Sequence, residues 1–258
     1  MAMYDNANTV EKSFDLNYVS EHLIQAQWAE FIELKKVIAE LAIAKNAPIS
    51  ILDIGIGNAR IPMHLCGVKE IWEMITTYDG TDNAQACVDI SNQNITKYKI
   101  QNKVTAFLFE ATALATLQKK YDLVICTWFT PGNFYPDNFS FETYKNAEKI
   151  LDLTKNEKFD AVFYAAYNLI NEGGALLLGA CYIDNESTRQ KQEESYNKMG
   201  MTVITSNEDT FTATKEGFWS QRFTQEKLYS YLHFADTNKI VITSLDTYNY
   251  AMQIKIKK

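Results

Sequence analysis

Residues 49–60 read ISILDIGIGNAR, an apolar, β-branched run that passes directly into two glycines. A short run of this kind, ending at Gly55, predicts a buried strand of a parallel sheet. Glycine at positions 55 and 57 lets the backbone turn sharply and lets a ligand approach the main chain closely. A plain tight turn between a strand and a helix would explain the two glycines equally well if they stood alone.

The spacing after Gly55 distinguishes between cofactors. A dinucleotide fingerprint, GxGxxG, would place its third glycine at position 60, where this chain has Arg60, whose bulk would obstruct close packing of helix on strand. The pattern Asp53-x-Gly55-x-Gly57 instead resembles the glycine loop of class I S-adenosylmethionine-dependent methyltransferases, with Ala59 where the last glycine usually stands. The phosphate loop GxxxxGK[ST] is absent, which argues against nucleotide hydrolysis.

Strands and helices alternate outward from this loop, which predicts a parallel sheet with helices on both faces. The expected strands are 49–54, 75–81, 104–109, 121–127 and 175–182, and the expected helices are 19–44, 59–66, 84–97 and 141–171, the last broken near 154–158. Residues 239–245 and 250–257, joined by turn formers, predict an antiparallel hairpin. The predicted fold class is therefore α/β: a Rossmann-like, doubly wound, mostly parallel seven-stranded sheet with a C-terminal antiparallel hairpin and an N-terminal helical cap.

The 258 residues fit a single decorated α/β domain. We expect one methyltransferase domain in four parts: an N-terminal helical cap (1–47), a cofactor-binding core (48–182), an insertion or lid (183–224) and a C-terminal helix and hairpin (225–258). The insertion should carry a helix over 186–199 and lie over the carboxyl edge of the sheet.

Composition narrows the classes of partner. The net charge of −7 argues against a broad nucleic-acid surface, and no apolar run is long enough to predict a membrane span or a secretory signal. The four cysteines lack a CxxC pattern, which favours reduced thiols and a cytoplasmic location. His22, His64 and His233 have no metal-ligand spacing, so no metal is expected.

The resemblance implies roles for residues at the ends of the predicted strands. Asp82 would accept hydrogen bonds from the ribose hydroxyls, with Asp79 as the competing candidate and helix capping as the alternative role. Glu110 would receive the adenine amino group, and the Ala111 N–H would face a ring nitrogen. The set of expected cofactor contacts is completed by Asn58, Asn83, Thr127 and the hydroxyl of Tyr18. Residues 171–178, NEGGALLL, resemble the family's junction between a helix and strand five, with the glycines as a helix C-cap.

The acceptor side is expected after the fourth strand, where residues 128–136 read WFTPGNFYP. The base-methylation motif [DNS]PP[YFW] is absent, and the segment 132–134 resembles GN[FS] in some amino-acid N-methyltransferases. Asn133 could orient a carboxylate or amine, and aromatic faces suit a cationic amine. The remaining candidates are Trp128, Phe134 and Tyr135 as walls, Phe129 beside them, and Trp219 and Arg222 in a lid; the alternative is that the aromatic residues belong to the core.

These patterns predict an enzyme that transfers a methyl group from S-adenosylmethionine to nitrogen or oxygen of a small molecule by in-line displacement. Two alternatives stay open: a protein or peptide methyltransferase, and a non-catalytic module that binds S-adenosylmethionine or its demethylated product. A nicotinamide-dependent oxidoreductase is a third, and Arg60 argues against it. No nucleic-acid or membrane partner is expected, and the sequence identifies neither a general base nor the oligomeric state.

Overall fold

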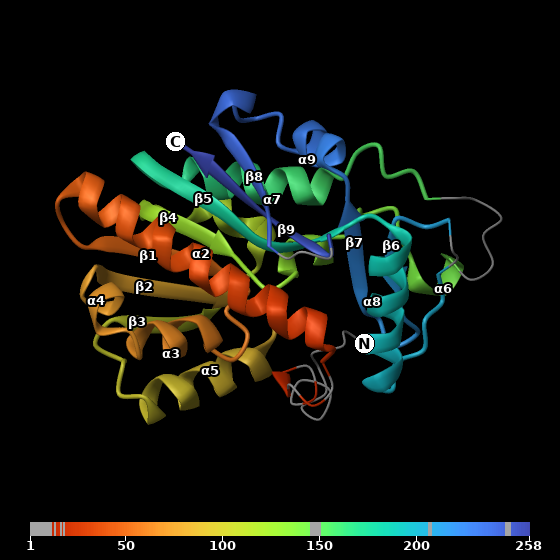
Figure 1. Ribbon diagram of the computed structural model, residues 1–258, viewed down its shortest axis with the longest axis horizontal. Helices are drawn as coiled ribbons and strands as arrows, with labels where there is room; N and C mark the ends of the chain where they lie inside the picture. Colours follow the sequence, from red (N-terminus) through yellow and green to blue (C-terminus); the bar gives the residue numbers. More distant parts are fainter. Residues whose placement is uncertain are drawn as a thin grey trace.

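The computed structural model describes residues 12, 14–15, 17, 19–144, 151–205, 208–245 and 249–258. Within these residues a nine-stranded sheet is covered by helices on both faces (Figure 1). Its strands are β1 (Ile49–Ile54), β2 (Ile75–Asp82), β3 (Val104–Leu108), β4 (Tyr121–Cys126), β5 (Ile170–Ile183), β6 (Phe211–Ala213), β7 (Trp219–Phe223), β8 (Ile240–Ser244) and β9 (Ala251–Lys257).

The order of the strands is that of a doubly wound sheet. β3, β2, β1, β4 and β5 lie side by side and parallel, and β9 follows antiparallel between β5 and β8. This confirms the predicted mostly parallel sheet with a C-terminal antiparallel pair. The predicted seven strands are joined by β6 and β7, which the sequence did not reveal.

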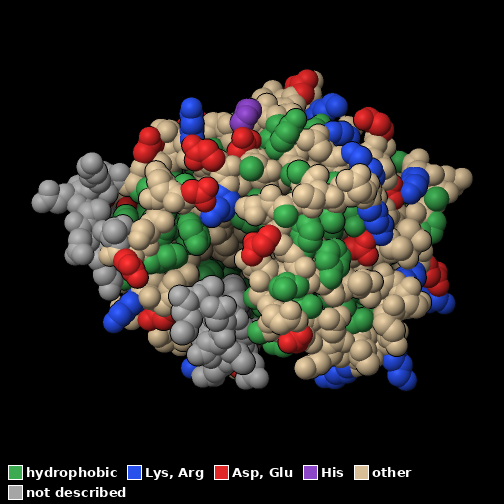
Figure 2. Space-filling view, turned by 180° about the vertical axis from the view of Figure 1, so that it is seen from behind, with side chains coloured by type: hydrophobic (Ala, Val, Ile, Leu, Met, Phe, Trp, Pro, Cys, Tyr) green, Lys and Arg blue, Asp and Glu red, His purple; other side chains and the backbone are tan. Residues whose placement is uncertain are grey.

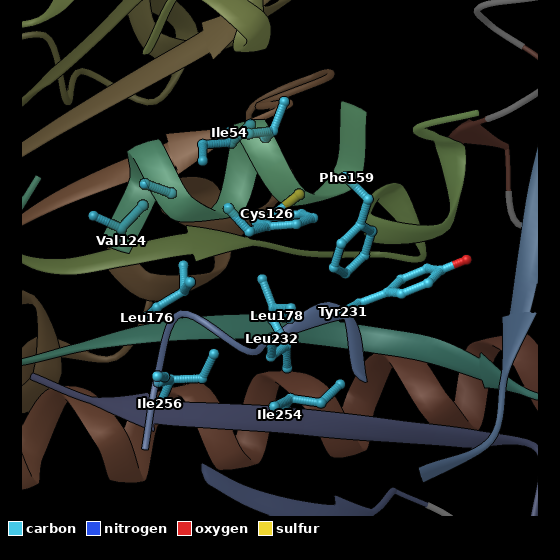
Figure 3. Packing of buried hydrophobic residues seen from close by; sticks show 14 of the residues in the cluster. Ile54, Val124, Cys126, Phe159, Leu176, Leu178, Tyr231, Leu232, Ile254 and Ile256 are labelled. Atoms are coloured by element: carbon cyan, nitrogen blue, oxygen red, sulfur yellow. The ribbon is translucent and has the colours of Figure 1, made fainter. Parts of the chain in front are cut away.

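Helices cover each face because alternate residues of the central strands point to opposite sides. One face is covered by α2 (Glu21–Lys45), α3 (Arg60–Cys66), α4 (Lys69–Glu73) and α5 (Gln85–Lys97). The other is covered by α7 (Glu157–Asn168), α9 (Gln225–Tyr231) and the 3-10 helix η3 (Ala111–Thr116). On that second face, Phe159 of α7 and Tyr231 of α9 lie over Cys126 and Leu178 (Figure 3).

The stretch 141–171, predicted as two helices with a break near 154–158, has its break there but is corrected in its first part. α6 (Phe141–Tyr144) is a single turn, and α7 begins only at Glu157, where the Asn156 side chain accepts a hydrogen bond from Phe159 N at 3.1 Å. Residues 151–156 are not helical, and residues 145–150 lie outside the described part of the chain.

The second correction concerns the glycine pair at 173 and 174. α7 ends at Asn168 with Leu169 as its C-cap, so Gly173 is not the cap that we expected. The pair lies inside β5, which begins at Ile170 rather than 175, and the pairing with β4 shifts register there. Gly173 has a φ of +78°, and a Cβ on Gly174 would overlap the Asp122 carbonyl oxygen. Glycine is thus required for an irregular strand rather than for a helix end.

The insertion after β5 consists of α8 (Glu186–Lys198), β6 and β7. β7 pairs parallel with the last residues of β5, Tyr182 opposite Arg222 and Ile183 opposite Phe223. Because β4 has already ended at Cys126, β7 extends the sheet beyond the carboxyl end of β4. The chain is completed by η4 (Thr130–Asn133) and η5 (Thr237–Lys239). In the described ranges, no helix combines the length and apolar character needed to cross a bilayer.

Candidate active site

The glycine loop between β1 and α3 is a tight turn built on left-handed residues. Gly55 and Gly57 have φ values of +81° and +61°, and Ala59 also lies in this region with a φ of 61°. The N–H groups of Gly55 and Ile56 both donate to the Thr81 carbonyl of β2, at 2.8 and 2.9 Å. An L-residue in this conformation costs about 1–2 kcal/mol, which explains why glycine suits all of these positions and why Ala59 is a departure.

Polar side chains of helix α5 donate hydrogen bonds to the backbone carbonyls of the glycine loop. Ser91 Oγ donates to the Gly57 carbonyl at 2.8 Å, and Asn94 Nδ2 donates to the Asn58 carbonyl at 2.9 Å. The Asn58 side-chain oxygen accepts from Arg60 N at 3.2 Å. Asn58, an expected cofactor contact, therefore also fixes the start of α3.

Asp82 ties the end of β2 to the glycine loop. Its Oδ2 accepts from Gly57 N and its Oδ1 from Ala84 N, each at 3.0 Å, and burial raises the pKa of this carboxyl above its ordinary value. Asp79, the competing candidate, is engaged elsewhere, accepting from Lys119 Nζ at 2.6 Å and Tyr121 OH at 2.8 Å. The structure thus places Asp82, and not Asp79, against the loop.

The remaining expected cofactor contacts lie at the carboxyl ends of neighbouring strands. Phe109 N donates to the Asp82 carbonyl at 2.8 Å, which brings the exposed Glu110 and then Ala111, the first residue of η3, to the same edge. Asn83 is exposed beside Asp82, and Thr127 is buried directly after β4. Ligands of open α/β sheets bind at this edge.

Asp53 lies beneath the loop rather than facing outward. Its side chain is only 1% exposed, and Tyr78 OH donates to its Oδ2 at 2.6 Å. Its Oδ1 has no hydrogen-bond partner among the described residues. Burial raises the pKa of Asp53 to about 7, although the Tyr78 hydroxyl and the Arg60 guanidinium act to lower it. Asp53 is therefore buried beneath the loop, and its expected contact with the cofactor stays a prediction.

Sequence reasoning missed Glu30, a fully buried carboxylate on α2 that reaches the same edge. Its Oε1 accepts from Trp128 N at 2.8 Å and Ala180 N at 2.7 Å, and its Oε2 lies 3.7 Å from Arg60 Nη2. Burial raises the pKa of Glu30 despite the adjacent Arg60. The available signal was the position of Glu30 on the apolar stripe of the helix, where a charge needs a partner.

Of the acceptor-side candidates, Trp128, Phe129 and Asn133 gather after β4. Trp128 and Phe129 are consecutive left-handed residues, with φ values of 54° and 61°, and Phe129 stacks on Tyr182 with ring centroids 3.9 Å apart. Asn133 Oδ1 is buried without a hydrogen-bond partner in the described chain. Phe134 packs edge-on against Phe163 of α7 at 5.4 Å, so it joins the core.

The structure corrects the expectation for Arg222 and Trp219. Arg222, 2% exposed, donates to Asp184, Gln192 and Thr212 at 3.3, 2.8 and 2.7 Å and to the Asp209 and Phe211 carbonyls, so its donors are used within the insertion. Trp219, also 2% exposed, stacks on Phe211 at 3.9 Å inside an aromatic cluster. Both side chains hold the insertion together instead of lining its surface.

Tyr18 lies outside the described residues, so its contact with a cofactor carboxylate stays a prediction. The ring of Phe14 lies against the glycine loop, where a Cβ on Gly57 would be 3.0 Å from it. Among the residues that the structure describes, no group of three or more histidine, cysteine or acidic side chains could hold a metal ion.

The face opposite to that of Figure 1 is hollowed near its centre, bordered by acidic and hydrophobic side chains (Figure 2).

Comparison with known proteins gives a likeness in structure only. No protein-family model matches the sequence, and no curated protein is significantly similar to it. Among solved structures, the CcbJ methyltransferase from Streptomyces caelestis has a TM-score of 0.59 at 12% identity, covering 99% of this chain and 98% of its own.

Two further solved structures agree with it. Magnesium protoporphyrin IX methyltransferase from Synechocystis, with bound SAH (S-adenosylhomocysteine), has a TM-score of 0.55 at 15% identity, covering 93% and 89% of the two chains. An S-adenosylmethionine-dependent methyltransferase from Clostridium acetobutylicum has a TM-score of 0.54 at 12% identity, covering 90% of each. Together with the strand order and the glycine loop, these likenesses show that the chain has the Rossmann-like fold of the class I S-adenosylmethionine-dependent methyltransferases.

Proposed function

We propose that this protein is an S-adenosylmethionine-dependent methyltransferase that acts on nitrogen or oxygen of a small molecule. The observation that carries the proposal is the glycine loop, locked by Asp82 at the carboxyl edge of a sheet with the class I methyltransferase strand order. The bound SAH in a neighbour of the same fold supports the choice of cofactor.

The residues at this edge fit a nucleoside with a diol and an amino group. The Asp82 carboxylate accepts from Gly57 N and Ala84 N and also interacts with Asn83 N and the Cys87 thiol, so ribose hydroxyls would replace the last two of these contacts. Glu110 is an exposed carboxylate that suits an exocyclic amino group. At Gly55 and Gly57 the missing side chains let Thr130 and the Phe14 ring lie close to the main chain of the loop.

The cofactor would supply an electrophilic methyl group on a sulfonium. The chain's own task is then to hold the acceptor in line, and orientation of this kind can contribute roughly 7–11 kcal/mol. Trp128 and Asn133 can orient an acceptor but cannot take a proton from it. An acceptor atom with a free lone pair, as in a neutral amine or a carboxylate, would need no base from these two side chains.

The size of the acceptor is limited by the insertion. η4 packs against β7, where a Cβ on Gly132 would lie 2.8 Å from the Gln221 carbonyl oxygen. β7 therefore covers the segment that follows β4, and this closed edge supports a small molecule over an extended peptide.

The test is titration calorimetry with SAH. We expect wild type to bind, and Asp82→Ala to bind at least about tenfold more weakly, because hydrogen bonds to a charged group contribute about 1.5–3 kcal/mol each. Asp79→Asn, on the same strand but turned to Lys119 and Tyr121, is the matched control and should bind within about threefold of wild type. No binding by wild type, or equal binding by Asp82→Ala, would contradict the proposal. Binding without transfer to any acceptor would favour the non-catalytic module.

A further inference from the structure

The segment after β4 has an unusual backbone. Trp128 and Phe129 follow one another in the left-handed region, with φ values of 54° and 61°, and neither is glycine. Such residues are strained and persist only where their surroundings determine them. Strain of this kind gathers at functional sites, and here it lies at the edge where the acceptor is proposed to bind.

The Glu30 carboxylate is what determines this turn. Its Oε1 accepts from the N–H of Trp128 at 2.8 Å and from the N–H of Ala180 at 2.7 Å, and Phe129 N donates to the Ala180 carbonyl at 2.8 Å. One buried oxygen thus holds the N–H groups of two separate segments. The approach depends on Gly179, because a Cβ there would overlap Glu30 Oε1.

Arg60 connects Glu30 to the side chain of the same turn. Its guanidinium lies 3.7 Å from Glu30 Oε2 and 4.5 Å from the centroid of the Trp128 ring. With its amide oxygen turned toward Arg60, Gln27 accepts from Nε at 2.8 Å and from Nη1. Arg60 is also the first residue after the glycine loop, and Thr130 packs on Gly55 of that loop.

Resting on the proposed function, we propose that Glu30 is a positioning residue: with Arg60 it fixes the left-handed Trp128–Phe129 turn and thereby the surface that holds the methyl acceptor. Neither residue touches the reacting atoms. Loss of Glu30 should therefore disturb the acceptor side and leave the cofactor side, held by Asp82, Ser91 and Asn94, largely as it is.

The experiment is amide hydrogen exchange resolved to residues 127–133 and 178–182, on wild type, Glu30→Ala, Glu30→Gln and Glu33→Gln. Glutamine still offers an oxygen to both N–H groups but no charge, and alanine offers neither. Exchange of the Trp128 and Ala180 amides should rise roughly tenfold in Glu30→Gln and further in Glu30→Ala. Glu33→Gln, one turn away and bonded only to Lys36 among the contacts found for it, should match wild type.

Two readouts separate positioning from general stability. Exchange in β2 should stay at its wild-type rate in all three variants, and SAH affinity should stay within about threefold in Glu30→Gln. Unchanged exchange at Trp128 in both Glu30 variants would overturn the proposal. If neither variant folds, rapid exchange of the Trp128 and Ala180 amides in wild type would overturn it, and slow exchange would support it. Failure of wild type to bind SAH would instead reject the proposed function, and the exchange result would stand separately.

Discussion

Replacing Gly57 by valine is expected to lower the affinity for SAH by at least about a hundredfold, close to 2.7 kcal/mol. Gly57 has a φ of +61°, a region in which a β-branched residue is a genuine outlier. Its Cβ would also stand 3.0 Å from the Phe14 ring, which lies against the loop. A backbone shift that relieves the strained φ or the contact with the Phe14 ring would break the hydrogen bond from Gly57 N to Asp82. Titration calorimetry on a sample shown to be folded by circular dichroism measures the effect.

Gly200→Val is the matched control for this substitution. Gly200 also has a left-handed φ, +82°, but a Cβ there would have no atom within 4 Å. It lies just after α8, away from the glycine loop, so valine should bring the backbone strain without the loss of binding. A folded Gly57→Val protein that binds SAH as wild type does would show that the loop has been assigned wrongly.

The central strands could be predicted because their signal is local. β1 and β4 are buried on both faces, so their residues are mostly apolar, with Ser50, Asp53 and Asp122 as the polar exceptions. β7 is equally buried but reads Trp-Ser-Gln-Arg-Phe, because Arg222 is satisfied by hydrogen bonds within the insertion and Gln221 by bonds with Asn156 and Tyr231. A polar strand of this kind has no apolar run to reveal it.

The difference between local and long-range signals also explains which residues of the candidate site could be predicted. The glycine loop and Asp82 are recognisable because the loop is continuous in sequence and the aspartate is the last residue of the next strand. Glu30 was missed because its partners, Trp128 and Ala180, are 98 and 150 residues away. Arg222 was expected to meet a substrate because residue type alone does not show that its donors are occupied within the fold.

Asp53→Asn is expected to change how stability depends on pH. Burial raises the pKa of Asp53 from its ordinary value of 3.8 to about 7 in the folded chain. Between these values the folded state binds more protons than the unfolded state, so this group lowers the free energy of unfolding as pH rises. The loss is complete above pH 7 and is of the order of 4 kcal/mol. Asparagine does not titrate in this range. The free energy of unfolding of the variant should therefore rise steadily, relative to that of wild type, between pH 4 and 7.

Asp122→Asn supplies the opposite case. Although burial acts to raise it, hydrogen bonds from Lys45, Ser50 and Asn171 hold the pKa of Asp122 below its ordinary value. The Asp122 carboxylate stabilises the fold at every pH above its pKa in the unfolded chain, and this stabilisation is lost only as the pH falls below that value. The difference in free energy of unfolding between Asp122→Asn and wild type should therefore be constant from pH 5 to 8. Urea unfolding at a series of pH values measures both differences. If the difference in free energy of unfolding between Asp53→Asn and wild type were also independent of pH, the Asp53 carboxylate would be stabilised as an ion beneath the loop. The attraction of Arg60 would then outweigh the cost of burying that charge.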